Sequence, residues 1–170
     1  MDPFSAEGGR RIHPASISIH SNDDFQSQNL DLVASADHTS TELVNIHSEF
    51  HQGQYHKVTE FLISSLSPSN QLPARVLQLR ARIALRQYDG VISELNGEDD
   101  TPAFAALRAF AQYSKDPWDA EDAMKTVERL VTEEEDNMTV QLLCGTILAN
   151  QGRSEEAVAL LAKHQGSLDA

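Results

Sequence analysis

The 170-residue sequence predicts an all-α fold built from repeated helical hairpins. A short corner motif returns four times, and apolar residues on both sides of each corner recur at intervals of three and four, as on one face of a helix. Aligned on the small apolar residue that opens the second helix of each pair, the four copies lie 33, 32 and 34 residues apart. These residues are Val58, Val91, Ala123 and Ala157. A period near 34 residues is typical of tetratricopeptide repeats, so we expect a tetratricopeptide-like α-solenoid of about four hairpins in a right-handed superhelix.

The first hairpin is expected to turn at Gly53, because glycine tolerates the left-handed backbone that ends a helix. Tyr55 follows the corner, where its ring can pack between the two helices. The two apolar stripes are Leu43, Ile46 and Phe50, and then Val58, Phe61, Leu62 and Leu66.

The second hairpin is expected to follow a chain break at residues 67–70, with Pro73 in the first turn of its first helix. No glycine precedes Tyr88, so the corner is expected to be one residue tighter than the first. The stripes are Val76, Leu79, Ile83 and Ala84, and then Val91, Ile92 and Leu95.

The third hairpin begins with Thr101 as a cap and Pro102 in the first turn, and its corner falls at residues 114–117, where the register is open by a residue or two. Its stripes are Ala103, Leu107 and Phe110, and then Ala123, Met124, Val127, Leu130 and Val131.

The fourth hairpin turns at Gly152. Ser154 is expected to cap the last helix, with Glu155 and Glu156 in the first turn, where the helix dipole favours negative charge. Its stripes are Val140, Leu143, Ile147 and Leu148, and then Ala157, Val158, Leu160 and Leu161.

The charge of the chain limits its partners. A formal net charge of −13 argues against direct binding of nucleic acid or an anionic membrane, since both are negative, and favours a basic partner. The acidic runs 98–100 and 133–136 are expected to be mainly solvated charge rather than a docking site. The single cysteine, Cys144, cannot form an intrachain disulfide and indicates a reducing compartment. The sequence has no secretory signal and no apolar run of about 18 residues.

The sequence indicates no catalytic residue, no metal site and no cofactor. His47 and His51 lie four residues apart, but the residue after the first is Ser48, whereas a metalloprotease helix has glutamate there. No glycine-rich phosphate loop and no framed nucleophile are present, so we expect a protein that is not an enzyme.

A partner-binding face is expected on the first helix of each hairpin, which lines the inside of such a solenoid. The inward positions of the first unit are mainly apolar, which disfavours a clamp for a chain-terminal carboxylate and favours an apolar protein segment. The ten candidate residues are Leu43, His47, Phe50, Val76, Arg80, Ile83, Arg108, Gln112, Leu142 and Thr146.

Three stretches resemble the epsilon subunit of coatomer in its fungal form: ELVNIHSEFHQGQY at 42–55, LRARIAL at 79–85 and VQLLCGT at 140–146. The resemblance implies a non-catalytic structural subunit of the COPI vesicle coat, which acts in Golgi-to-ER retrograde and intra-Golgi transport. It implies repeats that curl around the C-terminal domain of the alpha subunit, and indirect association with the other coatomer subunits. It places the protein in the cytoplasm, peripherally on Golgi membranes and COPI-coated vesicles. A generic cytosolic tetratricopeptide adaptor that binds an apolar peptide of another protein is the alternative.

The domain organisation follows from the same resemblance. Residues 42–170 are expected to form the repeat domain, truncated at its C-terminus because family members continue into further repeats. Residues 1–41 are expected to be a disordered N-terminal segment, since they lack a regular apolar face. Within it, residues 9–41 are either a translated intron or a genuine disordered arm.

Overall fold

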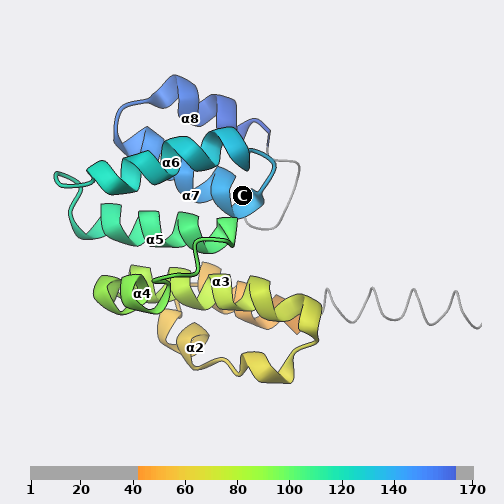
Figure 1. The fold of residues 1–170 in the computed structure, drawn as a ribbon. Helices are drawn as coiled ribbons and strands as arrows, with labels where there is room; N and C mark the ends of the chain where they lie inside the picture. Colours follow the sequence, from red (N-terminus) through yellow and green to blue (C-terminus); the bar gives the residue numbers. More distant parts are fainter. Residues whose placement is uncertain (1–41, 164–170) are drawn as a thin grey trace, which may run out of the picture. The chain divides into compact units, whose positions relative to one another are not determined.

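The computed structural model describes residues 42–163, and the predictions for residues 1–41 and 164–170 lie outside this part of the chain. The described residues form eight α-helices and one short 3-10 helix, without a strand among them. The fold is therefore the expected all-α, tetratricopeptide-like solenoid (Figure 1).

The helices form four consecutive hairpins, and the second helices of the pairs begin at steps of 33 residues. Within the described region, α5 packs against both α3 and α7, so the first helices of successive hairpins lie against one another. The helix of residues 42–51 pairs with α2 (Tyr55–Glu60), and the remaining pairs are α3 (Pro68–Ala84) with α4 (Tyr88–Glu94), α5 (Pro102–Lys115) with α6 (Glu121–Glu133), and α7 (Met138–Asn150) with α8 (Ser154–Leu161).

Three of the four corners share one hydrogen-bonding pattern. In each, a residue with positive φ donates its N–H to the carbonyl three residues back, and the next residue donates to the carbonyl five residues back at 2.9 Å. This is the Schellman motif, which satisfies carbonyls at the end of a helix. The positive-φ residues are Gly53 (74°), Arg86 (60°) and Gly152 (78°). The prediction of a tighter second corner is wrong, because Arg86 takes the place of the missing glycine.

The third corner uses a side chain instead. The Asp116 carboxylate accepts hydrogen bonds from the N–H groups of Trp118 at 3.0 Å and Asp119 at 3.3 Å. Aspartate commonly stabilises turns in this way. The corner carries the Trp118 side chain outward, where it is 97% exposed.

The start of the second hairpin also differs from the prediction. Helix α3 begins at Pro68, so Pro73 lies inside the helix rather than in its first turn. Because proline has no N–H, it cannot complete the helical bond to the carbonyl of Ser69. The start of α3 is held by the Glu42 carboxylate, which accepts from the Ser67 N–H at 3.0 Å and from the Asn70 side chain at 2.7 Å.

Two smaller differences concern helix ends. Helix α2 stops at Glu60, which leaves Leu62 66% exposed instead of in the predicted stripe. Leu66 reaches the core after the 3-10 helix at Ile63–Ser65. The N-cap of α8 is Arg153, whose side chain makes no capping hydrogen bond, and Ser154 is the first helical residue instead of the predicted cap.

The hydrophobic core has two parts, and α3 contributes to both. The first core consists of Ile46, Val58, Leu66, Ala74, Leu77 and Ala81. The second core takes Val76, Leu79 and Ile83 from the other side of α3 and continues through α4 to α8. All four corner-aligned residues, Val58, Val91, Ala123 and Ala157, are buried as predicted.

Candidate partner-binding face

The candidate binding face is formed by the helix of residues 42–51 and by α3, α5 and α7; we call it the first-helix face. Helix α3 is central to this face, because its residues line two neighbouring hollows. These hollows have volumes of about 320 and 380 Å³. We name them after one lining residue each, the Met138 hollow and the Phe50 hollow.

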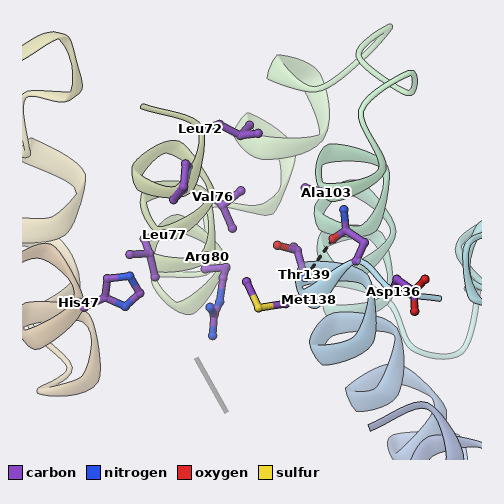
Figure 2. A pocket seen from close by; sticks show the side chains of 11 residues that line it. His47, Leu72, Val76, Leu77, Arg80, Ala103, Asp136, Met138 and Thr139 are labelled. Atoms are coloured by element: carbon purple, nitrogen blue, oxygen red, sulfur yellow. Dashed lines mark hydrogen bonds between the residues drawn. The ribbon is translucent and has the colours of Figure 1, made fainter. Parts of the chain in front are cut away.

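The Met138 hollow lies between α3 and the start of α7 (Figure 2). Apart from Arg80, its α3 wall is apolar, whereas the wall at the start of α7 is mixed. Leu72 and Met138, from the two walls, are about half exposed, at 47% and 48%. The lining consists of His47, Leu72, Pro73, Val76, Leu77, Arg80, Ala103, Asp136, Asn137, Met138 and Thr139.

The α7 wall is held in place by a side-chain cap. Asn137 accepts from the N–H groups of Thr139 at 3.0 Å and Val140 at 3.2 Å; Figure 2 draws the bond to Thr139. One turn further on, the buried amide of Gln141 donates to the Glu135 carbonyl at 2.8 Å. These bonds fix the start of α7 before any partner is bound.

The Phe50 hollow is richer in aromatic groups. Phe50 packs edge-on against Tyr55, with ring centroids 5.5 Å apart. The Arg80 guanidinium lies over the Phe50 ring, 4.6 Å from its centroid, a cation–π arrangement. The lining consists of Phe50, Arg80, Ile83, Ala84, Arg86, Tyr88, Phe110, Ser114, Leu142, Leu143 and Thr146.

Arg80 lines both hollows and is the residue that joins them. In Figure 2 its side chain lies between His47 and Met138. A long cationic side chain at this point can direct its charge toward a segment that occupies either hollow.

The structure places seven of the ten candidate residues in the two hollows and three outside them. Leu43 packs against the first core, Arg108 forms an ion pair with Asp99 at 2.6 Å, and Gln112 is half-buried on α5. The seven that line hollows are His47, Phe50, Val76, Arg80, Ile83, Leu142 and Thr146.

Sequence reasoning missed several lining residues. Met138 is the first residue of α7, Leu72 lies before the apolar stripe of α3, and Arg86 lies in a corner, so none belongs to the apolar stripes that guide the prediction. The sequence pattern assigns Tyr88 only to packing, yet this residue also lines the Phe50 hollow. The regular spacing of Tyr55 and Tyr88 along the sequence is the one feature that could have marked Tyr88 as a lining residue.

Two acids of the run 98–100 are engaged within the chain. The Glu98 carboxylate accepts hydrogen bonds from Nη1 and Nη2 of Arg75, both at 3.0 Å, and the same guanidinium lies 4.6 Å from the centroid of the Phe104 ring. The hydrogen bonds with Glu98 raise the pKa of Arg75 above its ordinary value. Asp99 pairs with Arg108. These acids therefore tie the loop after α4 to α3 and α5 instead of being only solvated charge.

The histidine, cysteine and acidic side chains of the described region do not come together as a reaction centre. The rings of His47 and His51 are stacked with centroids 6.3 Å apart, but no three His, Cys, Asp or Glu side chains of residues 42–163 gather as metal ligands would. Cys144 is fully buried, which raises the pKa of its thiol to about 12, so it is not a reactive thiolate. No helix of the described part is long and apolar enough to cross a membrane.

Comparison with known proteins decides the family. The sequence model of the coatomer epsilon subunit matches residues 39–170, most of the chain. The chain belongs to the coatomer epsilon subunit family. The epsilon-type resemblance seen in the sequence is thereby confirmed, while its fungal form stays a prediction.

Among curated relatives of this epsilon-family chain is "Coatomer subunit epsilon-2" of Arabidopsis thaliana, which is 29% identical over 112 residues. The aligned part covers 64% of this chain and 38% of the relative, so the chain matches well under half the length of that protein. No solved structure matches the chain.

Proposed function

We propose that this chain is a non-catalytic structural part of the COPI coat and that it holds the C-terminal domain of the alpha subunit on its first-helix face. In this role it acts in Golgi-to-ER retrograde and intra-Golgi transport, in the cytoplasm and peripherally on Golgi membranes. Membership of the coatomer epsilon family supports the assignment to the coat. It also favours the coat over a generic tetratricopeptide adaptor.

The observation that carries the binding proposal is the pair of adjacent hollows that meet at Arg80. Binding energy at protein interfaces concentrates in a few large side chains, with tyrosine, tryptophan and arginine enriched among them. The Phe50 hollow supplies Phe50, Tyr88 and Phe110 beside Arg80, within one depression. A protein segment that fills it would bury aromatic and arginine surface together.

The outer helix α6 has a different character. Lys125 pairs with Glu121 at 2.9 Å, and Arg129 pairs with Glu133 at 3.0 Å, all on the solvent-exposed side of α6. Such exposed pairs are well solvated and contribute little to binding or stability. This contrast supports the first-helix face as the interface, and it makes α6 a suitable place for control substitutions.

The test is capture, by this chain, of a tagged C-terminal domain from the alpha subunit. The double variant Phe50→Ala/Arg80→Glu is expected to weaken capture by roughly 30-fold or more, since loss of one hot-spot side chain alone is worth about 2 kcal/mol. Its helical circular dichroism is expected to stay unchanged. The matched control, Lys125→Ala/Arg129→Glu on α6, is expected to bind as the unmodified chain does. Equal capture by the Phe50/Arg80 variant would reject this face.

A further inference from the structure

We propose that the dipeptide Asn96–Gly97 is a site of spontaneous deamidation, and that its isoaspartyl product loosens the joint between α3 and α5. The dipeptide lies in the loop that connects α4 to α5 (Figure 1). Among the asparagines of the sequence, Asn96 alone is followed by glycine. The modification is therefore confined to one position of the chain.

The reaction needs only these two residues and water. The backbone nitrogen of Gly97 gives up its proton and bonds to Cγ of Asn96, while the bond from Cγ to the side-chain nitrogen breaks and ammonia leaves with that proton. Attack within one dipeptide is favoured because the two groups are already held close together. Water then opens the cyclic imide at one of its two carbonyl carbons, which gives either aspartate or isoaspartate, whose chain runs through Cγ. Glycine favours the attack because it has no Cβ to hinder its nitrogen.

The structure leaves both reacting groups accessible. Asn96 and Gly97 are exposed, and within the described part of the chain neither the Asn96 side chain nor the Gly97 N–H makes a hydrogen bond. The turn around them is held by long contacts: the Glu98 N–H donates to the Leu95 carbonyl at 3.2 Å, and the Asn96 N–H lies 3.4 Å from the Ser93 carbonyl, against a usual upper limit of about 3.2 Å. Such a turn opens locally at little cost, which lets the nitrogen approach Cγ.

Other sites that could react are held by the fold. The Asn70 amide donates to a carboxylate at 2.7 Å, and Oδ1 of Asn137 accepts two backbone N–H groups. Neither residue precedes glycine. Asp89–Gly90 could form the same imide, but it lies inside α4 and its carboxylate accepts a hydrogen bond from Lys115. These positions serve as internal controls.

Isoaspartate would lie directly before two anchors of the loop. The Glu98 carboxylate accepts hydrogen bonds from Arg75 of α3 at 3.0 Å, and Asp99 pairs with Arg108 of α5 at 2.6 Å. Isoaspartate adds one carbon, about 1.5 Å of path, to the backbone just before them. The longer path displaces both carboxylates from their arginines, so the contact between the second and third hairpins is weakened.

The first experiment incubates the folded chain at neutral pH and physiological temperature and maps its tryptic peptides by mass spectrometry. In the peptide from Gln87 to Arg108, the expected change is replacement of the Asn96 amide nitrogen by oxygen, with isoaspartate detected by methylation with an isoaspartyl methyltransferase. Asp89, Asn70 and Asn137 are expected to stay unchanged. An unchanged Asn96, after a time in which a synthetic peptide of residues 91–101 has converted, would overturn the proposal.

The second experiment measures the effect on the fold by thermal melting. The incubated chain is expected to melt about 4 °C lower than before incubation, as loss of a contact worth about 1 kcal/mol predicts for a domain of this size. Asn96→Ser, which has no carboxamide to react, is expected to keep its melting temperature through the same incubation. Fresh Asn96→Asp adds the charge without the extra carbon and is expected to melt as the unmodified chain does. Equal melting of the isoaspartyl chain and incubated Asn96→Ser, or an equal loss in fresh Asn96→Asp, would overturn the loosening of the joint by the longer backbone.

Discussion

Arg86 and Gly152 occupy the same position in two corners of the repeat: each ends the first helix of its hairpin in the left-handed conformation, with φ values of 60° and 78°. Glycine adopts this conformation without strain, whereas an arginine Cβ crowds the following carbonyl. The second corner is thus built on a residue that disfavours its own backbone conformation.

Replacing Arg86 by glycine is expected to raise the free energy of unfolding by about 1 kcal/mol, because the left-handed strain is removed. Urea unfolding followed by circular dichroism measures it. Gly152→Ala is the reverse control: a Cβ there meets nothing within 4 Å, so its expected loss of about 1 kcal/mol comes from the backbone alone. A less stable Arg86→Gly variant would show that the contacts of the Arg86 side chain stabilise the fold by more than its left-handed backbone destabilises it.

Gly145 allows α7 and α8 to pack closely. A Cβ at this position would lie 2.9 Å from Cγ of Leu161, closer than side chains normally approach. Gly145→Leu is therefore expected to lower the free energy of unfolding by about 1 to 3 kcal/mol through overpacking. In a Leu161→Ala background the same change is expected to be less damaging, since the space is vacated. Equal effects in both backgrounds would mean that the two residues are not coupled.

Ala157 tests the register of the last hairpin. It is 2% exposed and belongs to the second core, so Ala157→Asp is expected to bury an unpaired carboxylate and to destabilise the fold by several kcal/mol. Lys57→Ala, on an exposed position of α2, is the control and is expected to be nearly neutral. Thermal melting ranks the two variants. A melting series in which Lys57→Ala is the worse variant would contradict the register.

The buried Cys144 is expected to lower the free energy of unfolding at alkaline pH. Burial raises its pKa in the folded chain to about 12, whereas the unfolded thiol has a pKa of about 8.5. Above the unfolded pKa the unfolded state releases a proton that the folded state retains, so the free energy of unfolding falls as pH rises from about 8.5 toward 12. At a pH of about 10 the unmodified chain is expected to have lost about 2 kcal/mol more than Cys144→Ala, relative to neutral pH. Parallel curves for the two proteins, measured by urea unfolding, would exclude this linkage.

The repeat was predictable from the sequence because its signals are local. The recurring corner motif and the apolar spacing on both sides of it identified four hairpins, and the structure buries all four aligned residues, Val58, Val91, Ala123 and Ala157. These signals operate within a few turns of helix, where sequence distance and spatial distance agree.

The features that the sequence did not predict depend on a choice between two possible helix starts or on contacts between residues far apart in the chain. Both Pro68 and Pro73 suit a helix start, and only the contacts of Glu42 with Ser67 and Asn70 favour the earlier one. No propensity indicates that an arginine will adopt a left-handed conformation.

Parts of the candidate site could not be predicted from the sequence either, because they join residues that are far apart in the chain. The Met138 hollow joins Leu72 to Met138, and nothing in the spacing of two residues so far apart predicts that they share a hollow. Only the packing of α3 on α5, and of α5 on α7, brings the two helix starts together.

The contribution of α3 to both hydrophobic cores affects how the domain unfolds locally. Solenoid repeats often fray from their ends, one unit at a time, because each contacts only its neighbours. Here Ala74, Leu77 and Ala81 belong to the first core while Val76, Leu79 and Ile83 belong to the second. Loss of the first hairpin would leave one side of α3 in water while its other side stayed packed. The backbone amides of α3 are therefore expected to exchange with solvent only when both cores open, which makes this helix the slowest-exchanging and most cooperative segment of the domain.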